Sequence, residues 1–166
     1  MTDQTPVAAT MPMSAPADYY DMTRVRPEVA AAMAKINELG PVFASRAKAV
    51  DDDASFPTDN YKDLADAGFL GLSIPQEFGG WGFSMGEYAM VGAEIAKYCG
   101  ATALTFNMHN SSMAWSRFMY DMPNLTEAER AAFAPLRAKQ FTRAMKERAI
   151  FSQPISEGGQ NWTSKP

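Results

Sequence analysis

Several patterns that would define other protein classes are scarce or missing in this chain of 166 residues. The single cysteine, Cys99, excludes a disulfide within the chain and fits a reducing compartment. The formal net charge of −4 gives no basic field of the kind that marks nucleic-acid binding. No apolar run is long enough to span a bilayer, and the N-terminus lacks the basic and apolar regions of a secretory signal. These absences favour a cytoplasmic protein.

Metal-binding and nucleophilic patterns are also missing. His109 is the one histidine, and no partner stands at a readable spacing, so we interpret it as a hydrogen-bonded core residue. Cys99 is interpreted as a small buried apolar group. Residues 51–53 are three aspartates without the alternating ligands of a calcium loop, and residues 79–82 lack the Lys-Ser/Thr of a phosphate loop. The sequence therefore predicts no catalytic residue and no metal site.

What the chain does have is apolar residues at steps of three and four, the pattern of helices that bury one face. Ser84 with Glu87 and Thr126 with Glu129 have the spacing of capping boxes, so each pair predicts a helix start. Helices are expected over residues 27–50, 57–67, 84–99, 102–120 and after 126. The helix over 102–120 is apolar nearly all round, which predicts a central position.

Glycine and proline refine these expectations. Gly40-Pro41 interrupts the first apolar stripe without changing its phase, which predicts one kinked helix. Gly100 is expected to end the third helix, and Pro135 to split the last helical region. The inner face of that last region is expected to carry Leu136, Phe141 and Met145.

Two further segments differ from these helices. Residues 69–74 are apolar and short, and we expect them to cross the core as extended chain. Residues 149–159 read as a strand that leads into a glycine turn, which cannot be stable alone. We predict an all-α bundle of about five to six helices with a short C-terminal β segment that begins a truncated β-domain. The expected divisions are a disordered leader at 1–17, the helical domain at 18–148 and the start of the β-domain at 149–166.

The order of motifs from Phe56 to Gly82 resembles a known family. This stretch reads FPTDNYKDLADAGFLGLSIPQEFGGWG: a helix started by proline, a glycine stop, an apolar segment, and a glycine turn that follows Ile74-Pro75. A long helix comes next. In this order the elements resemble the N-terminal helical domain of the acyl-CoA dehydrogenases, flavoenzymes that desaturate acyl thioesters. The resemblance covers roughly residues 27–159.

The resemblance implies contacts with FAD and with an acyl chain. Residues 156–159, Ser-Glu-Gly-Gly, look like the family's Thr/Ser-Glu-Pro-Gly motif, which would place three residues against the flavin ring: Gln153, Ile155 and Ser156. Taking Asn110-Ser111 as the family's Asn-Ser pair assigns the acyl cavity to Leu104, Thr105, Met108 and Ser112. Without the resemblance, the same residues fit an edge strand with a turn and ordinary core packing. Residues 160–162 do not match the family's phosphate contacts.

Family membership would imply FAD-dependent α,β-desaturation of an acyl-CoA thioester. The family's carboxylate base comes from a C-terminal helical domain, and Glu77, Glu87 and Glu157 stand in turn or cap contexts. We therefore expect a homo- or hetero-oligomer, with an electron-transfer flavoprotein as a candidate acceptor, and self-association through exposed core surface. The alternatives are a non-catalytic helical partner subunit or interaction module, and a fragment of a longer gene.

Overall fold

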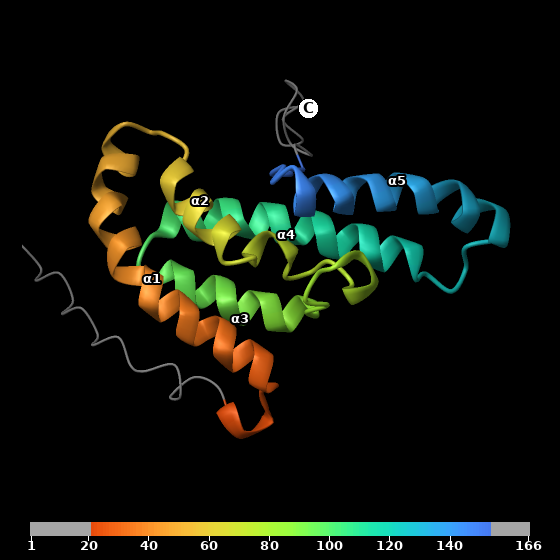
Figure 1. Cartoon of the computed structure of the whole chain (residues 1–166), viewed down its shortest axis with the longest axis horizontal. Coiled ribbons are helices and arrows are strands. Elements are labelled where there is room, and N and C mark those ends of the chain that lie inside the picture. Colours follow the sequence, from red (N-terminus) through yellow and green to blue (C-terminus); the bar gives the residue numbers. More distant parts are fainter. Residues whose placement is uncertain (1–20, 154–166) are drawn as a thin grey trace, which may run out of the picture.

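The computed structural model describes residues 21–153. These residues form five α-helices: α1 (Pro27–Asp52), α2 (Thr58–Asp66), α3 (Met85–Ala96), α4 (Gly100–Tyr120) and α5 (Glu127–Lys146) (Figure 1). Three 3₁₀ turns accompany them: η2 (Met22–Arg24), η3 (Phe69–Gly71) and η4 (Gln76–Phe78). The predicted all-α bundle is confirmed. The expected leader and most of the expected β segment lie outside the described residues, and residues 150–153 are neither helix nor strand.

The first helix is continuous and bent, as predicted. Pro27 occupies its first turn, where the missing N–H has no helical partner to lose. The helix runs through Pro41 without a break, and Figure 1 shows it changing direction along its length. Gly40 is required there because a Cβ would overlap the ring of Tyr98. Glycine at position 40 therefore permits α1 to approach the chain just after α3 closely.

Two expectations about helix ends were wrong. Gly100 does not end α3, which stops at Ala96; Cys99 is extended (φ −153°) and Gly100 begins α4. Pro135 does not split the last helix, which continues from Glu127 to Lys146. The carbonyl that loses its helical partner to Pro135 belongs to Ala131, an exposed residue, so water can bond it. Leu136 is 63% exposed and does not belong to the inner face, whereas Phe141 is fully buried.

The segment between α2 and α3 is buried but not extended, contrary to expectation. Gly68 (φ +80°) stops α2, and η3 then turns the chain sharply through the core. Residues 71–74 are bonded to residues 81–83 by three backbone hydrogen bonds of 2.8–3.0 Å. The glycine turn between them is structural, as predicted, because a Cβ on Gly80 would overlap the carbonyl oxygen of Ile74.

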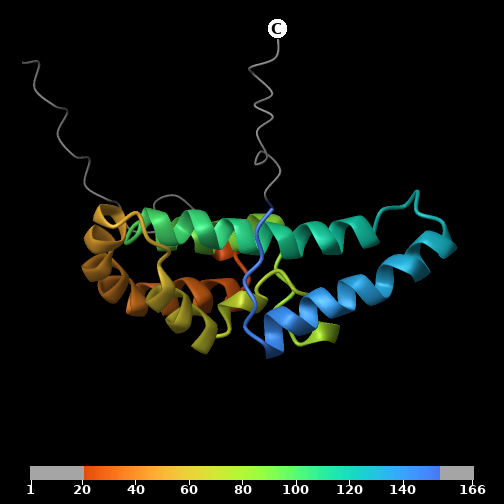
Figure 2. The ribbon, with the colours of Figure 1, turned by 90° about the horizontal axis from the view of Figure 1, so that it is seen from above.

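Buried apolar side chains form two clusters. The large cluster joins α1, α2, η3, α3 and the first half of α4: Val29, Ala32, Met33, Ile36, Phe43, Leu64, Phe69, Leu72, Phe83, Tyr88, Val91, Ile95, Cys99 and Phe106. The small cluster joins the second half of α4 to α5: Ile74, Met113, Phe141 and Ala144. Figure 2 shows α2 and α5 on the same side of α4, with no described helix covering the opposite side.

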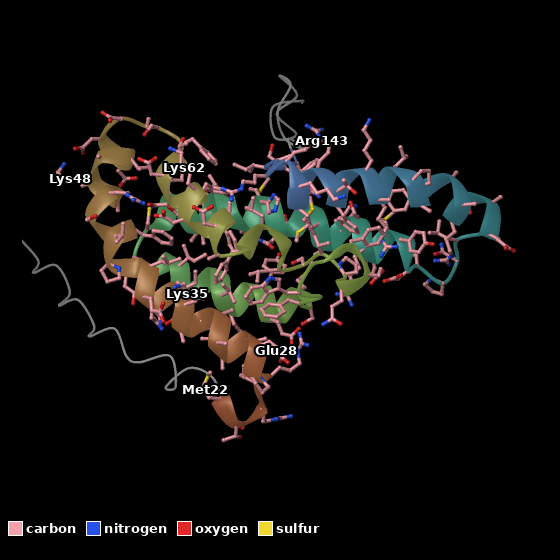
Figure 3. The ribbon with its side chains drawn as sticks, viewed as in Figure 1. Met22, Glu28, Lys35, Lys48, Lys62 and Arg143 are labelled. Carbon is pink, nitrogen blue, oxygen red and sulfur yellow. The ribbon has the colours of Figure 1, made fainter. Side chains whose placement is uncertain are left out.

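Many charges on the surface are paired within single helices. Lys35, Lys48 and Lys62 project outward (Figure 3) and bind carboxylates three or four residues away at 2.6–2.8 Å. Such exposed pairs are worth little to stability. Within residues 21–153, no helix has the length and apolar character needed to cross a bilayer.

Candidate substrate wall and cofactor-facing segment

One side of α4 presents apolar side chains to solvent. Leu104 is 67% exposed, Trp115 53% and Phe118 56%, and Met108 beside them is half-buried. At 3.6 residues per turn these four positions fall on one stripe, which we call the open side of α4. The expected central position of α4 is confirmed by its contacts with α1, α3, α5 and η3, but the helix is not buried on all sides. The described residues bury α4 on one side, through α3, α1, η3 and α5.

Of the four residues expected to line the acyl cavity, Leu104 is exposed and Thr105 and Met108 are half-buried at this side, whereas Ser112 is buried (4% exposed) at its edge. Leu104, Thr105, Met108 and Ser112 fall within an arc of about 100° on α4. Thr105 donates to the carbonyls of Ala101 (2.9 Å) and Thr102 (3.1 Å), and Ser112 donates to that of Met108 (2.8 Å). Hydroxyls that bond their own helix in this way turn hydrocarbon outward. The accessible part of this arrangement is an apolar wall made by Leu104 and Met108, with Thr105 beside them.

A shallow apolar groove of about 460 Å³ continues the wall toward the end of α4. Its sides come from the start of α3 and the second half of α4, and its lining includes Phe83, Met85, Trp115 and Phe118. The rings of Trp115 and Phe118 lie 5.8 Å apart. Sequence reasoning missed this groove because it assigned both rings to the core. One sequence feature could have indicated the groove. Met85 directly follows the cap residue Ser84, so the sequence places this apolar side chain at the start of a helix.

His109 is a hydrogen-bonded core residue, as expected, and it uses both ring nitrogens. It is fully buried on the inner side of α4. Its Nε2 lies 2.9 Å from the carbonyl oxygen of Leu70, and the N–H of Phe151 donates to its Nδ1 at 3.2 Å. Burial lowers the pKa of His109, against a smaller opposite effect of the bond to Leu70. The imidazole is therefore a neutral connector of three chain segments.

The chain leaves α5 through residues 147–153, which we call the exit segment. Arg148 adopts a left-handed conformation (φ +55°), and the N–H of Ala149 bonds the carbonyl of Arg143 at 3.1 Å. Phe151 packs against the small cluster. Of the residues expected to contact flavin, Gln153 ends the exit segment and is half-buried, while Ile155 and Ser156 lie outside the described residues.

The carboxylates near this region have structural partners. The Glu87 carboxylate accepts hydrogen bonds from the N–H and the hydroxyl of Ser84 and two from Arg26, and these contacts, with the bonds from Arg26 the largest cause, lower the pKa of Glu87 to about 2. Glu77 binds Arg137 at 3.2 Å. Because its pKa is lowered so far, the Glu87 carboxylate is a poor proton acceptor at neutral pH. No group of potential metal ligands occurs within residues 21–153.

Comparison with known proteins identifies the class. The model of the acyl-CoA dehydrogenase N-terminal domain matches residues 31–121, more than half of the chain. The chain therefore belongs to the acyl-CoA dehydrogenase family, as the motifs between Phe56 and Gly82 had indicated.

Three curated relatives illustrate the similarity. The probable acyl-CoA dehydrogenase YngJ of Bacillus subtilis is 35% identical over 64 residues, which cover 39% of this chain and 17% of the relative. The acryloyl-CoA reductase (NADH) of Anaerotignum propionicum is 38% identical over 72 residues, 43% of this chain and 17% of the relative. The short-chain specific acyl-CoA dehydrogenase of Clostridium acetobutylicum is 31% identical over 78 residues, 47% of this chain and 20% of the relative. In each case the match covers no more than a fifth of the relative's length.

Proposed function

We propose that this chain supplies one wall of the acyl cavity and the first cofactor contacts of a flavoprotein that desaturates an acyl-CoA thioester. The observation that carries the proposal is the open side of α4. Its side chains are apolar and exposed, although α4 belongs to a well-packed bundle. A contiguous exposed apolar surface of this kind marks a binding site.

The chemistry of the wall fits an acyl tail. Met108 supplies a flexible, polarizable surface that adapts to chains of different shape. Thr105 and Ser112 have satisfied hydroxyls, so neither needs a polar ligand. Leu104 extends the apolar surface outward. These residues would bind the tail and exclude water from it; none of them is assigned a proton-transfer role.

The exit segment fits a flavin ring. The N–H groups of Ser152 and Gln153 donate no hydrogen bond to another residue that the structure describes. N–H groups that have no partner among the described residues can bond the acceptors on the pyrimidine edge of a flavin, and we assign that role to Gln153 together with Ile155 and Ser156. When bound, FAD supplies the acceptor for the substrate hydride.

The names of the relatives support a CoA thioester as substrate. Those three proteins are named for acyl-CoA or acryloyl-CoA, although one is a reductase and two are dehydrogenases. The shared N-terminal region thus accompanies more than one reaction, which agrees with a binding role. We assign the catalytic base to sequence outside this chain. Turnover would then require an oligomer that contains such a base, with an electron-transfer flavoprotein as candidate acceptor.

The substrate wall can be tested by titrating the ¹⁵N-labelled chain with a saturated acyl-CoA and, separately, with free CoA. We expect the acyl-CoA to shift amide signals along α4 and free CoA to leave them unchanged. Met108→Glu should abolish the shifts, whereas Leu136→Glu, which changes an exposed leucine on α5, should preserve them. Equal shifts with both ligands, or shifts confined to α5, would contradict the assignment.

A direct assay tests catalysis by this chain alone. We expect no acyl-CoA-dependent dye reduction by the purified protein, because no carboxylate base is assigned to it. Turnover by this chain alone would overturn that conclusion.

The second candidate, a non-catalytic partner subunit, draws on the same open side of α4. That surface could bind another polypeptide rather than an acyl tail. A colourless protein that co-purifies with a longer flavoprotein, and whose α4 signals ignore acyl-CoA, would favour this candidate. In isolation the open side should promote self-association, and Trp115→Ser with Phe118→Ser should shift the chain toward monomer in sizing experiments.

A further inference from the structure

The two halves of the proposed site lie on different parts of the chain. The acyl wall is on α4, and the cofactor contacts begin at Gln153, at the end of the exit segment. A dehydrogenation needs the acyl chain and the flavin to be held in fixed relation, since small displacements of reacting groups are costly. Something must therefore fix the exit segment relative to α4.

His109 makes that connection. It follows Met108 on α4, and its ring faces inward, where it meets both the η3 turn and the exit segment. Because the carbonyl of Leu70 can only accept a hydrogen bond, Nε2 must carry the proton. Nδ1 then has a free lone pair, which the N–H of Phe151 uses. One neutral tautomer satisfies both bonds.

Further contacts hold Phe151 in this place. Its ring centroid is 6.3 Å from that of His109, and the guanidinium of Arg143 lies 5.8 Å from it. Arg143 projects from the end of α5 near the C-terminal end of the described chain (Figure 3). These contacts are apolar or cation–π contacts that tolerate sliding, whereas the bond to Nδ1 has a fixed direction.

We propose that His109 is a positioning residue, which sets the distance between the acyl wall and the cofactor contacts through its bond to Phe151. The inference rests on the proposed function. Gln153 is two residues beyond Phe151, so its Cα can lie at most about 7 Å from that of Phe151. Holding the Phe151 N–H on α4 therefore limits how far the first cofactor contact can lie from α4.

Two substitutions separate this role from simple core filling. In His109→Asn, the amide oxygen lies the same number of bonds from the backbone as Nδ1, so it can still accept from Phe151. In His109→Gln, the amide nitrogen lies the same number of bonds away as Nε2, so it can still donate to Leu70. Each variant keeps one bond, and both replace the ring by an amide.

The first measurement is hydrogen exchange at the Phe151 amide in the 166-residue chain. We expect His109→Gln to speed exchange about tenfold, the effect of losing one hydrogen bond, and His109→Asn to change it by less than about threefold. Equal acceleration in both variants, or in neither, would show that the imidazole only fills space.

The second measurement is the FAD concentration that half-maximally shifts the amide signals of Gln153, Ile155 and Ser156. We expect that concentration to rise several-fold in His109→Gln and to stay near the wild-type value in His109→Asn. If the half-maximal FAD concentration is equal in wild type and both variants, although the Phe151 amide exchanges faster in His109→Gln, the positioning role is wrong and the cofactor assignment stands. If FAD shifts none of them, the cofactor assignment fails, and with it the role.

A second pair of variants leaves α4 unchanged, in case either substitution of the buried histidine prevents folding. Phe151→Pro removes the N–H, while Phe151→Leu keeps it and removes the ring. Loss of FAD-induced shifts in Phe151→Pro but not in Phe151→Leu would support the bond to Nδ1 as the determinant. Loss in both would assign the effect to ring packing and overturn the proposal.

Discussion

The large and small clusters are built differently, although both include residues of α4. The large cluster has fourteen buried hydrophobic residues drawn from four helices and a turn, whereas the small cluster has four. A buried arginine lies beside the small cluster. Arg137 is 7% exposed, and its guanidinium lies 4.2 Å from the ring of Tyr120, 5.0 Å from that of Phe78 and 5.4 Å from that of Phe141.

The difference indicates that the two halves of α4 are held by different amounts of buried apolar surface. The first half of the helix is fixed by extensive apolar burial, which gives a rigid platform. The second half is fixed by fewer buried residues, and exposed apolar side chains occur on both halves, Leu104 on the first and Trp115 and Phe118 on the second. Two of the residues proposed for function, Met108 and His109, lie at the boundary between the two clusters. A site supported by a rigid element and bordered by a less stable one can be precise and still accessible.

The sharpest way to test this comparison is to remove one buried phenylalanine from each cluster. Phe106 and Phe141 are both fully buried. We expect Phe106→Ala to lower the free energy of unfolding by about 3–5 kcal/mol, because the packed surroundings cannot close the cavity. Phe141→Ala should cost less globally and should mainly open α5.

Urea unfolding measures the global effect, and amide exchange along α5 measures the local one. Equal global losses, with no preferential exchange in α5 of Phe141→Ala, would show that the two clusters form one cooperative core.

Sequence patterns anticipated the large cluster better than the small one. The apolar stripe of α1 and the capping box of Ser84 can both be recognised from local sequence, because each depends only on residues within the same helix. The exposure of Leu136 and Trp115 could not be anticipated, because an apolar helix surface looks the same in sequence whether a partner covers it or not. The family resemblance predicted which positions of α4 belong to the site. It could not predict the hydrogen bond between His109 and Phe151, because that bond joins residues 42 positions apart in the sequence.

The turn that joins the two clusters offers the next largest effect. A Cβ at position 80 would overlap backbone atoms of Ile74, which cannot move aside as a side chain could. We expect Gly80→Ala to cost about 1–3 kcal/mol in unfolding free energy, a value typical of forced strain in a packed site. Gly92, inside α3, has open space around its Cβ position, so Gly92→Ala should stabilise the chain by about 0.5–1 kcal/mol.

Thermal and urea unfolding measure both effects. Gly80→Ala reports the close backbone contact in the turn, and Gly92→Ala reports the helix propensity of α3. A tolerated alanine at position 80 would mean that the two clusters are joined more loosely than the backbone bonds of this turn indicate.

The boundary between the clusters should also be sensitive to pH. Burial lowers the pKa of His109 from its ordinary value of 6.5, so below pH 6.5 the unfolded chain binds a proton that the folded chain does not. Stability should therefore fall as pH decreases from about 6.5 toward the lowered pKa, by at most about 1.4 kcal/mol per pH unit. The measurement is the difference in unfolding free energy between wild type and His109→Asn at pH 7 and pH 5. A constant difference would contradict burial of a neutral imidazole.

The smallest effect is expected at the edge of the large cluster, where Arg26 joins the start of α1 to Glu87 at the start of α3. The pKa of Glu87 is lowered to about 2 from 4.5, chiefly by the hydrogen bonds from Arg26. Stabilisation by the Glu87 carboxylate should thus be complete above about pH 4.5 and lost as pH falls toward 2. Since Arg26 remains 45% exposed, water screens the pair, and we expect a loss of about 1 kcal/mol.

Unfolding of wild type and Glu87→Gln between pH 6 and pH 2 isolates this contribution, because the other carboxylates titrate in both proteins. Curves that stay parallel would place the stability of this edge in the apolar packing of α1 on α3 rather than in its charges.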